Sequence, residues 1–323
     1  MKKRTVITVV ALALSAILSL SMIGCGKGTR FTDLRETTKQ AAINYYENYN
    51  GYDNYGTIKI NFSKSEFSET YAETTYKPSA DAQVVTEPVI VMVKDEKITA
   101  TLQVKPIDGV LNVKVEQTVV SKVTSYSVNP ETSLLDKTET VNSQTTVHDF
   151  SKNEDSYYAR KLVSDKAGDA EAVETKTYQV YTSESEYKYA VENILDDISE
   201  SYTTDVLNVV GSAQLLAVTG LSPEVSKKRD AYTLSLGIDT FRIESNKPCD
   251  VYMGFDIKVS PTGVQEIKTE SSQNVLETQN YKVSMSATIG YANDLTAPVN
   301  PFDGYQSGSI SAYGIVPELD IGL

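Results

Sequence analysis

The 323-residue sequence contains no tryptophan, two cysteines and one histidine, and these shortages exclude several kinds of site. A single histidine, His148, excludes metal centres with several histidine ligands and permits one histidine-based triad at most. The sequence has no Gly-x-Ser-x-Gly nucleophile elbow and no phosphate-binding glycine loop. Without a nucleophile motif, we interpret His148, which precedes Asp149, as a half-exposed strand histidine. We therefore expect no enzyme activity, no metal site and no cofactor, and we rank a hydrolase last among the possible functions.

Positive charge is also scarce. The chain has 30 Lys and Arg against 43 Asp and Glu, so its formal net charge is −13. Loss of Lys2, Lys3 and Arg4 with an N-terminal signal lowers this charge to −16. Phosphate backbones and anionic lipid head groups repel so acidic a chain. We therefore expect no nucleic-acid partner.

Only the N-terminus carries an apolar run of membrane-spanning length. Met1 to Arg4 carry three positive charges, whereas Thr5 to Ile23 are 19 uncharged residues dominated by Val, Ile, Leu and Ala. A basic start followed by an apolar run is typical of a secretory signal. The alternative is a plain N-terminal transmembrane anchor, since a spanning helix needs about 20 residues.

The apolar run ends in Met22-Ile23-Gly24-Cys25, which resembles the lipobox of bacterial lipoproteins. In that family the cysteine thiol is acylated with diacylglycerol and the chain is cut before it. The resemblance implies that Cys25 is the lipidated N-terminus and that the domain is exported and anchored to the bacterial cell membrane on its extracytoplasmic side. Cys249 is then left without a partner for an intrachain disulfide. Its place on an alternating strand predicts a buried small hydrophobic residue.

The remaining sequence favours one β-rich α+β domain. The segment "TDLRETTKQAAINYYENY" predicts a helix capped by Thr32. From residue 57 to 181, and again after residue 230, apolar and polar residues alternate, with turn signals at Asp108-Gly109, Gly168 and Ser260 to Gly263. Strict alternation indicates an antiparallel sheet with one buried face.

Between the two alternating regions the period changes to that of a helix. Ser183 and Glu186 form a capping box, and apolar residues follow at helical spacing. We expect a signal peptide over 1–24, a lipidated tether over 25–30, one domain over 31–292 with a helical insert over about 184–220, and a Pro/Gly-rich segment over 293–323 that is either an ordered loop or a loose tail. In this arrangement one long-stranded, curved antiparallel sheet packs the N-terminal helix and the insert on one face.

The order of lipobox, short helix, long strands, helical insert and more strands resembles half-barrel lipoproteins, related to the bacterial periplasmic lipoprotein carrier and to mycobacterial lipid-binding lipoproteins. The resemblance implies an apolar cavity between sheet and helices that holds acyl chains. We expect a binding protein for an amphiphilic or small hydrophobic ligand, lined by the apolar face of the insert: Tyr187, Val191, Ile194, Leu195 and Ile198. Two alternatives stay open. That face is simply core, or the protein is a surface structural or adhesion lipoprotein whose tyrosine-rich strands contact a protein partner.

Overall fold

The computed structural model describes residues 58–153, 156–204, 224–244, 246–290 and 300–319, together with positions 33–34, 36–38, 40, 206, 210, 295, 297 and 298. The expected signal peptide, Cys25 and the tether lie outside these residues. Of the expected N-terminal helix, Asp33, Leu34 and the other described positions up to 40 are helical. Within the described part of the chain, no helix combines the length and the apolar character needed to cross a membrane.

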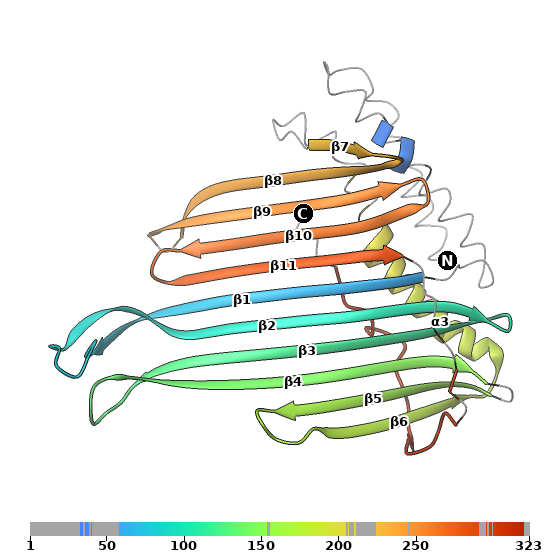
Figure 1. Cartoon of the computed structure of the whole chain (residues 1–323), viewed down its shortest axis with the longest axis horizontal. Helices are drawn as coiled ribbons and strands as arrows, with labels where there is room; N and C mark the ends of the chain where they lie inside the picture. The colour runs from blue at the N-terminus through green and yellow to red at the C-terminus, as the bar shows by residue number, and fades with distance from the viewer. Residues whose placement is uncertain are drawn as a thin grey trace.

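Twelve strands form one curved, open sheet (Figure 1). Their order across the sheet is β12-β6-β5-β4-β3-β2-β1-β11-β10-β9-β8-β7, and every neighbouring pair is antiparallel except β12–β6. The expected β-rich, curved antiparallel sheet is thus confirmed. The strands are β1 (Ile58–Tyr76), β2 (Val85–Ile107), β3 (Val110–Val128), β4 (Leu135–Lys152), β5 (Tyr157–Ala167), β6 (Val173–Tyr181), β7 (Glu224–Lys228), β8 (Ala231–Glu244), β9 (Lys247–Ser260), β10 (Gly263–Val275), β11 (Gln279–Gly290) and β12 (Gln306–Ser307).

The two alternating regions are halves of this sheet. Strands β1–β6 and β7–β11 each run as a meander, and β1 pairs with β11 from Lys59↔Gly290 to Thr70↔Gln279. The turn chemistry agrees with the prediction at Asp108-Gly109, where φ is 51° and 74° and the two residues join β2 to β3. Positive φ at both central residues is what a type I′ hairpin turn needs.

Helix α3 (Glu184–Ile198) and the π-helical turn η2 (Ser199–Thr204) follow β6. The Ser183 hydroxyl caps the helix by accepting from the Glu186 backbone N–H at 3.2 Å, and the Glu186 carboxylate reaches back to the Thr182 N–H at 3.0 Å, one residue before the N-cap position that a capping box uses. Helix α3 packs against β3, β5 and β6. We call the face that it covers the inner face and the opposite one the outer face. Beyond η2, Val206 and Val210 are helical, and the rest of the expected insert lies outside the described residues.

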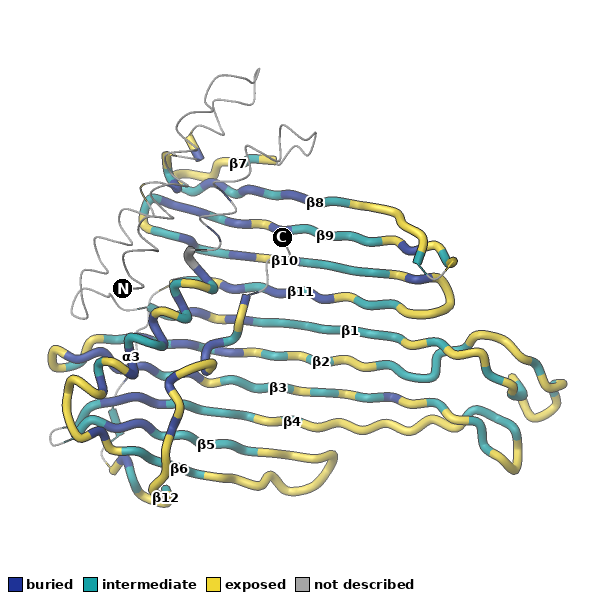
Figure 2. The backbone as a smooth tube through the Cα atoms, turned by 180° about the vertical axis from the view of Figure 1, so that it is seen from behind, coloured by how far each residue is buried: buried dark blue, intermediate teal, exposed yellow. Residues whose placement is uncertain are grey.

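The C-terminal strap, residues 300–319, is ordered and wraps around the β6 edge of the sheet. On the outer face the Phe302 ring contacts the rings of Tyr158 and Tyr178, with centroids 5.3 and 4.7 Å away. The strap then adds the short strand β12 beside β6 and continues on the inner face, where Ile310 and Val316 join the hydrophobic core. Figure 2 shows it crossing the sheet beside α3. The strap therefore belongs to the domain.

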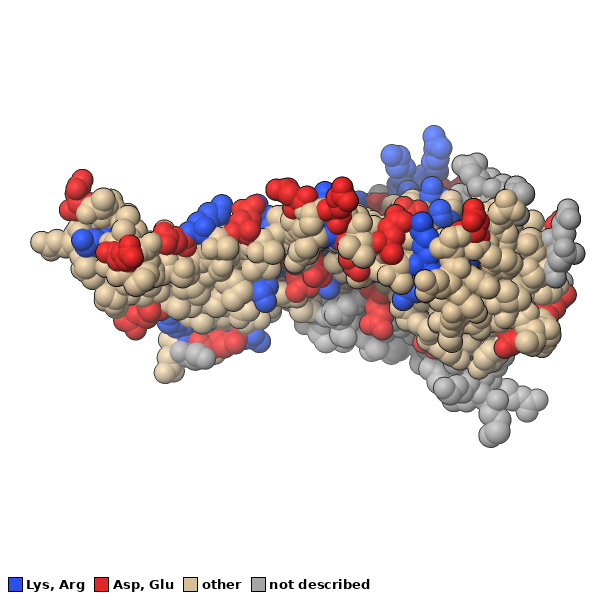
Figure 3. Space-filling model, turned by 90° about the horizontal axis from the view of Figure 1, so that it is seen from below, with Lys and Arg blue, Asp and Glu red and all other residues tan. Residues whose placement is uncertain are grey.

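The core lies at one end of the sheet. Strands β1–β4 continue far beyond α3, and there most residues are exposed or half-buried on both faces (Figure 2). Seen from below, the molecule is thin where these strands project and thick at the other end, with basic and acidic side chains intermixed along it (Figure 3). Cross-strand pairs link the projecting ends, including the Thr75 and Thr86 hydroxyls at 2.8 Å and the Lys122–Glu139 ion pair at 3.0 Å.

Candidate functional site

The five residues expected to line a cavity are buried in the core. Tyr187, Val191 and Ile194 are fully buried, and Leu195 and Ile198 are 2% exposed. The Tyr187 hydroxyl donates to the Leu111 carbonyl at 2.8 Å. None of the five lines either of the two grooves described next. In this structure the apolar face of α3 is packed against the sheet.

The inner groove is a hollow of about 400 Å³ on the inner face of the other half of the sheet. Its apolar walls stand on β8, β9 and β11, and its floor on β10 carries the small polar side chains Thr269 and Ser271. Register aligns these groups in rows across the strands, because Leu236 pairs with Phe255 and Ile238 pairs with Met253. The apolar wall consists of Leu236, Ile238, Met253, Phe255, Val283 and Met285.

Charged groups stand at the rim of the inner groove. Lys64 of β1 lines it and forms an ion pair with Glu66 at 3.0 Å. That hydrogen-bonded ion pair raises the Lys64 pKa, with partial burial opposing it, so the ammonium is charged at neutral pH. Glu318 of the C-terminal strap also lines the groove. The inner groove is therefore apolar along its walls and charged at its edges.

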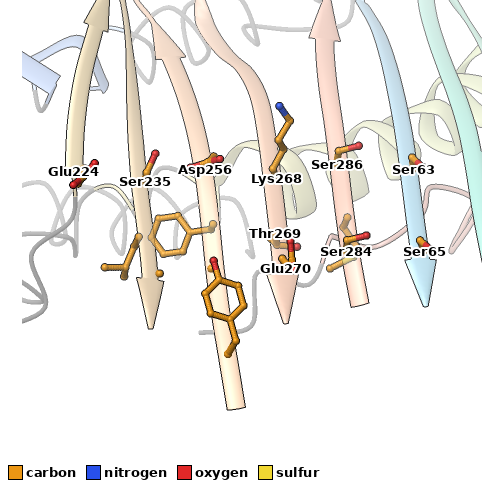
Figure 4. Close-up of a pocket in the computed structure, with 16 residues that line it drawn as sticks. Ser63, Ser65, Glu224, Ser235, Asp256, Lys268, Thr269, Glu270, Ser284 and Ser286 are labelled. Carbon is orange, nitrogen blue, oxygen red and sulfur yellow. The ribbon is translucent and has the colours of Figure 1, made fainter. Parts of the chain in front are cut away.

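The outer groove is a shallower hollow of about 730 Å³ on the opposite face of the same strands (Figure 4). Six strands contribute to it, β7 through Glu224 alone, and the register of the other five places their side chains in two rows that run across the strands. Small and hydroxyl-bearing residues dominate both rows, which leaves the groove open between taller side chains. The first row is Ser235, Asp256, Lys268, Ser286 and Ser63, and the second is Gly237, Gly254, Glu270, Ser284 and Ser65.

An aromatic ring forms one wall of the outer groove. Gly237 and Gly254 are directly paired on β8 and β9, and the Tyr252 side chain lies across both. A Cβ on Gly254 would stand 2.4 Å from the Tyr252 hydroxyl oxygen, and one on Gly237 would stand 3.3 Å from it. The ring occupies the space that side chains at these positions would take, and it covers backbone that the glycines would otherwise expose. Tyr252 is half-buried and lines the groove.

The outer groove carries more acidic than basic side chains. Lys268 forms an ion pair with Glu266 at 2.7 Å, and Glu270 forms one with Lys282 at 2.8 Å. Asp256 and Glu224 add two further carboxylates to its lining. The Glu266 hydrogen bond, with Asp256 adding attraction, raises the Lys268 pKa, so this ammonium stays protonated at neutral pH. The groove is negative on balance.

The single histidine is not part of a catalytic arrangement with its neighbour. His148 is half-buried on the inner face beside Lys161, and burial, aided by that lysine, lowers its pKa to about 4. Asp149 points to the outer face and forms an ion pair with Arg160. The expected strand position of His148 is therefore correct, and the two side chains lie on opposite faces.

Cys249 is fully buried, as the alternating pattern predicted, and it carries a free thiol. Among the described residues, no group of three or more His, Cys, Asp and Glu side chains is arranged to hold a metal ion.

Neither groove was recognised in the sequence analysis. A signal for the outer groove is present, since Ser63 and Ser65 on β1 and Ser284 and Ser286 on β11 repeat with the period of a strand. Two such repeats indicate two small-residue faces. They become one groove only through the pairing of β1 with β11, which places Ser65 opposite Ser284 although the two residues are far apart in the sequence.

Comparisons with known proteins do not identify a family. No family model and no curated protein matches the sequence. Among solved structures, the transport unit of the autotransporter AIDA-I from Escherichia coli aligns over 82% of this chain and 99% of that chain, with 9% identity and a TM-score of 0.20. The beta domain of the Bordetella autotransporter Brka aligns over 73% and 98%, with 8% identity and a TM-score of 0.16. Scores this low support no inference about fold or function.

Proposed function

We propose that the protein is a lipid-anchored, extracytoplasmic binding lipoprotein that holds an amphiphilic or small hydrophobic ligand in the inner groove. The observation that carries the proposal is the apolar hollow of about 400 Å³ with charged groups at its rim. Ligand sites are typically concave, mostly apolar and provided with a few polar groups that fix orientation. The protein acts by binding rather than catalysis in this proposal.

Three features support it. The lipobox-like sequence before Cys25 provides the anchor, and two acyl chains hold a protein stably to a membrane. The half-barrel resemblance implies an apolar cavity between a curved sheet and its helices, and here the sheet is open and α3 covers one half of one face. The site differs from the original expectation, since β8–β11 and the C-terminal strap line it instead of α3.

Lipid copurification tests the ligand. The full-length protein, extracted gently from its membrane, is examined by native mass spectrometry, and its affinity for a fluorescent fatty-acid probe is measured by titration. Ile238→Trp fills the groove and should weaken probe binding at least about tenfold, because overpacking leaves no room for the chain. The matched control is Val119→Trp, a half-buried residue on the inner face of β3 that does not line the groove. Equal probe affinity in wild type and Ile238→Trp would refute the inner groove as the site.

The anchor is tested separately. A Cys25→Ser variant expressed in a bacterium should no longer incorporate an alkyne fatty-acid label and should keep its uncut N-terminal apolar run, which intact-mass measurement detects. Incorporation that persists in Cys25→Ser would show that the thiol is not the acceptor, whatever the outcome for the groove.

A further inference from the structure

The outer groove has a shape that suits an elongated ligand. Its two rows cross β8, β9, β10, β11 and β1 at right angles to the strands. Five strands at the usual spacing give a trough roughly 19 Å long. Serine forms the floor on β1 and β11, so a ligand can approach the sheet surface closely there, whereas the Tyr252 ring covers the two glycines at the β8–β9 end.

The chemistry of the lining suits a ligand rich in hydroxyl groups. Serine hydroxyls both donate and accept hydrogen bonds, and carboxylates such as Asp256 accept from two donors at once. At the β8–β9 end, the Tyr252 ring lies over Gly237 and Gly254 and offers an apolar surface to the trough. A polyol with alternating hydroxyl and C–H surfaces matches this combination of hydroxyls, carboxylates and an aromatic ring.

Other ligand classes fit the groove less well. An extended peptide joins a sheet along an edge, where backbone groups are free, whereas these five strands already hydrogen-bond to their neighbours beneath the trough. The excess of carboxylates from Glu224, Asp256 and Glu270 over Lys268 repels nucleic acids and anionic polysaccharides. The lining is too polar for an acyl chain, in contrast to the inner groove.

We propose that the outer groove is a binding site for a neutral oligosaccharide chain, which lies across the strands with one sugar ring on Tyr252 and its hydroxyls on the serine and carboxylate side chains. The site is separate from the inner groove and does not depend on the function proposed above. The alternation of side chains along each strand directs the two linings to opposite faces.

Calorimetric titration of the full-length protein tests the site. The probes are neutral hexasaccharides of glucose, mannose and N-acetylglucosamine, with an oligogalacturonate of similar length as the anionic comparison, in a detergent without sugar head groups. We expect at least one neutral probe to bind and the anionic one to bind at least about tenfold more weakly. No saturable binding of any neutral probe up to about 10 mM, or equal binding of the anionic one, would overturn the proposal.

Groove-filling variants locate the binding. Ser65→Leu with Ser284→Leu, two residues paired across β1 and β11, should weaken the binding of the neutral probe at least about tenfold by filling the trough. The matched control is Ser143→Leu, a half-buried serine on the outer face of β4 outside the groove. If the double variant unfolds at a lower temperature than wild type, the exposed Asp256→Ala replaces it. Unchanged affinity in the folded groove variant, or an equal loss in Ser143→Leu, would place the ligand elsewhere.

Discussion

Acidification should destabilise the fold through His148. This side chain is half-buried on the inner face of β4 between Val115 of β3 and Lys161 of β5. Burial and the neighbouring ammonium both disfavour the imidazolium and lower the pKa from 6.5 to about 4. The unfolded chain therefore binds a proton as the pH falls through 6.5, whereas the folded chain stays unprotonated until about pH 4.

The magnitude follows from proton linkage. Between pH 6.5 and 4 the unfolded state binds more protons, so the free energy of unfolding falls as the pH falls. The two pKa values limit the total loss to about 3 kcal/mol, and about 2 kcal/mol of it is reached at pH 5. His148→Gln cannot be protonated, so the variant should lose about 2 kcal/mol less than wild type between pH 7.5 and pH 5.

Two measurements check this reasoning. Urea denaturation at pH 7.5 and pH 5 gives the free energy of unfolding of wild type and His148→Gln, and their difference removes the contribution of the other acids. Because the chain has one histidine, a proton NMR titration of the folded protein yields its pKa without assignment. Lys161→Met should raise that pKa by removing the nearby charge. A folded-state pKa near 6.5, or identical pH dependence in both proteins, would refute the argument.

Three further substitutions test contacts that hold the domain together, each by urea denaturation at pH 7.5. Asp149→Asn should lower the free energy of unfolding by about 3 kcal/mol, because it leaves the largely buried Arg160 charge without its carboxylate partner. Breaking an exposed ion pair such as Lys122–Glu139 should lower it by less than about 1 kcal/mol. Tyr187→Phe should lower the free energy of unfolding by about 1–2 kcal/mol, because the buried Leu111 carbonyl loses its hydrogen-bond donor. An unchanged free energy of unfolding would show that water replaces the hydroxyl. Ser183→Ala should lower the free energy of unfolding by about 1 kcal/mol, because it removes the hydroxyl that caps α3. Ser183→Asp should restore the lost stability, because a carboxylate can accept the same hydrogen bond.

The parts of the fold that depend on local pattern could be predicted from the sequence. Alternation identified strands such as β8 and β9, and the Asp108-Gly109 turn fixed a hairpin, because each needs only neighbours in the chain. The apolar stripe of α3 was also predicted. Periodicity shows that a helix face is buried but not whether protein or ligand covers it, so Tyr187 and its neighbours were equally consistent with a lined cavity and with core.

The parts that depend on distant contacts could not be predicted. The C-terminal strap has no regular period, and its order comes from contacts such as Phe302 with Tyr158 and Tyr202 with the Pro317 carbonyl, which join segments far apart in the sequence. The ion pair between Asp149 and Arg160 likewise depends on the β4–β5 register. Both grooves need the register of β1 with β11, and a shift of one residue would exchange their linings.

The two grooves share the same strand segments, and this makes them separable by mutation. On β9 the apolar Phe255 faces the inner groove, while its neighbours Gly254 and Asp256 face outward, and on β11 Met285 lies between Ser284 and Ser286 in the same way. A side chain enlarged on one face therefore leaves the lining of the other face in place. The paired glycines illustrate the consequence, since the Tyr252 ring fills the space above them on the outer face while their neighbours Leu236 and Phe255 keep their places in the wall of the inner groove.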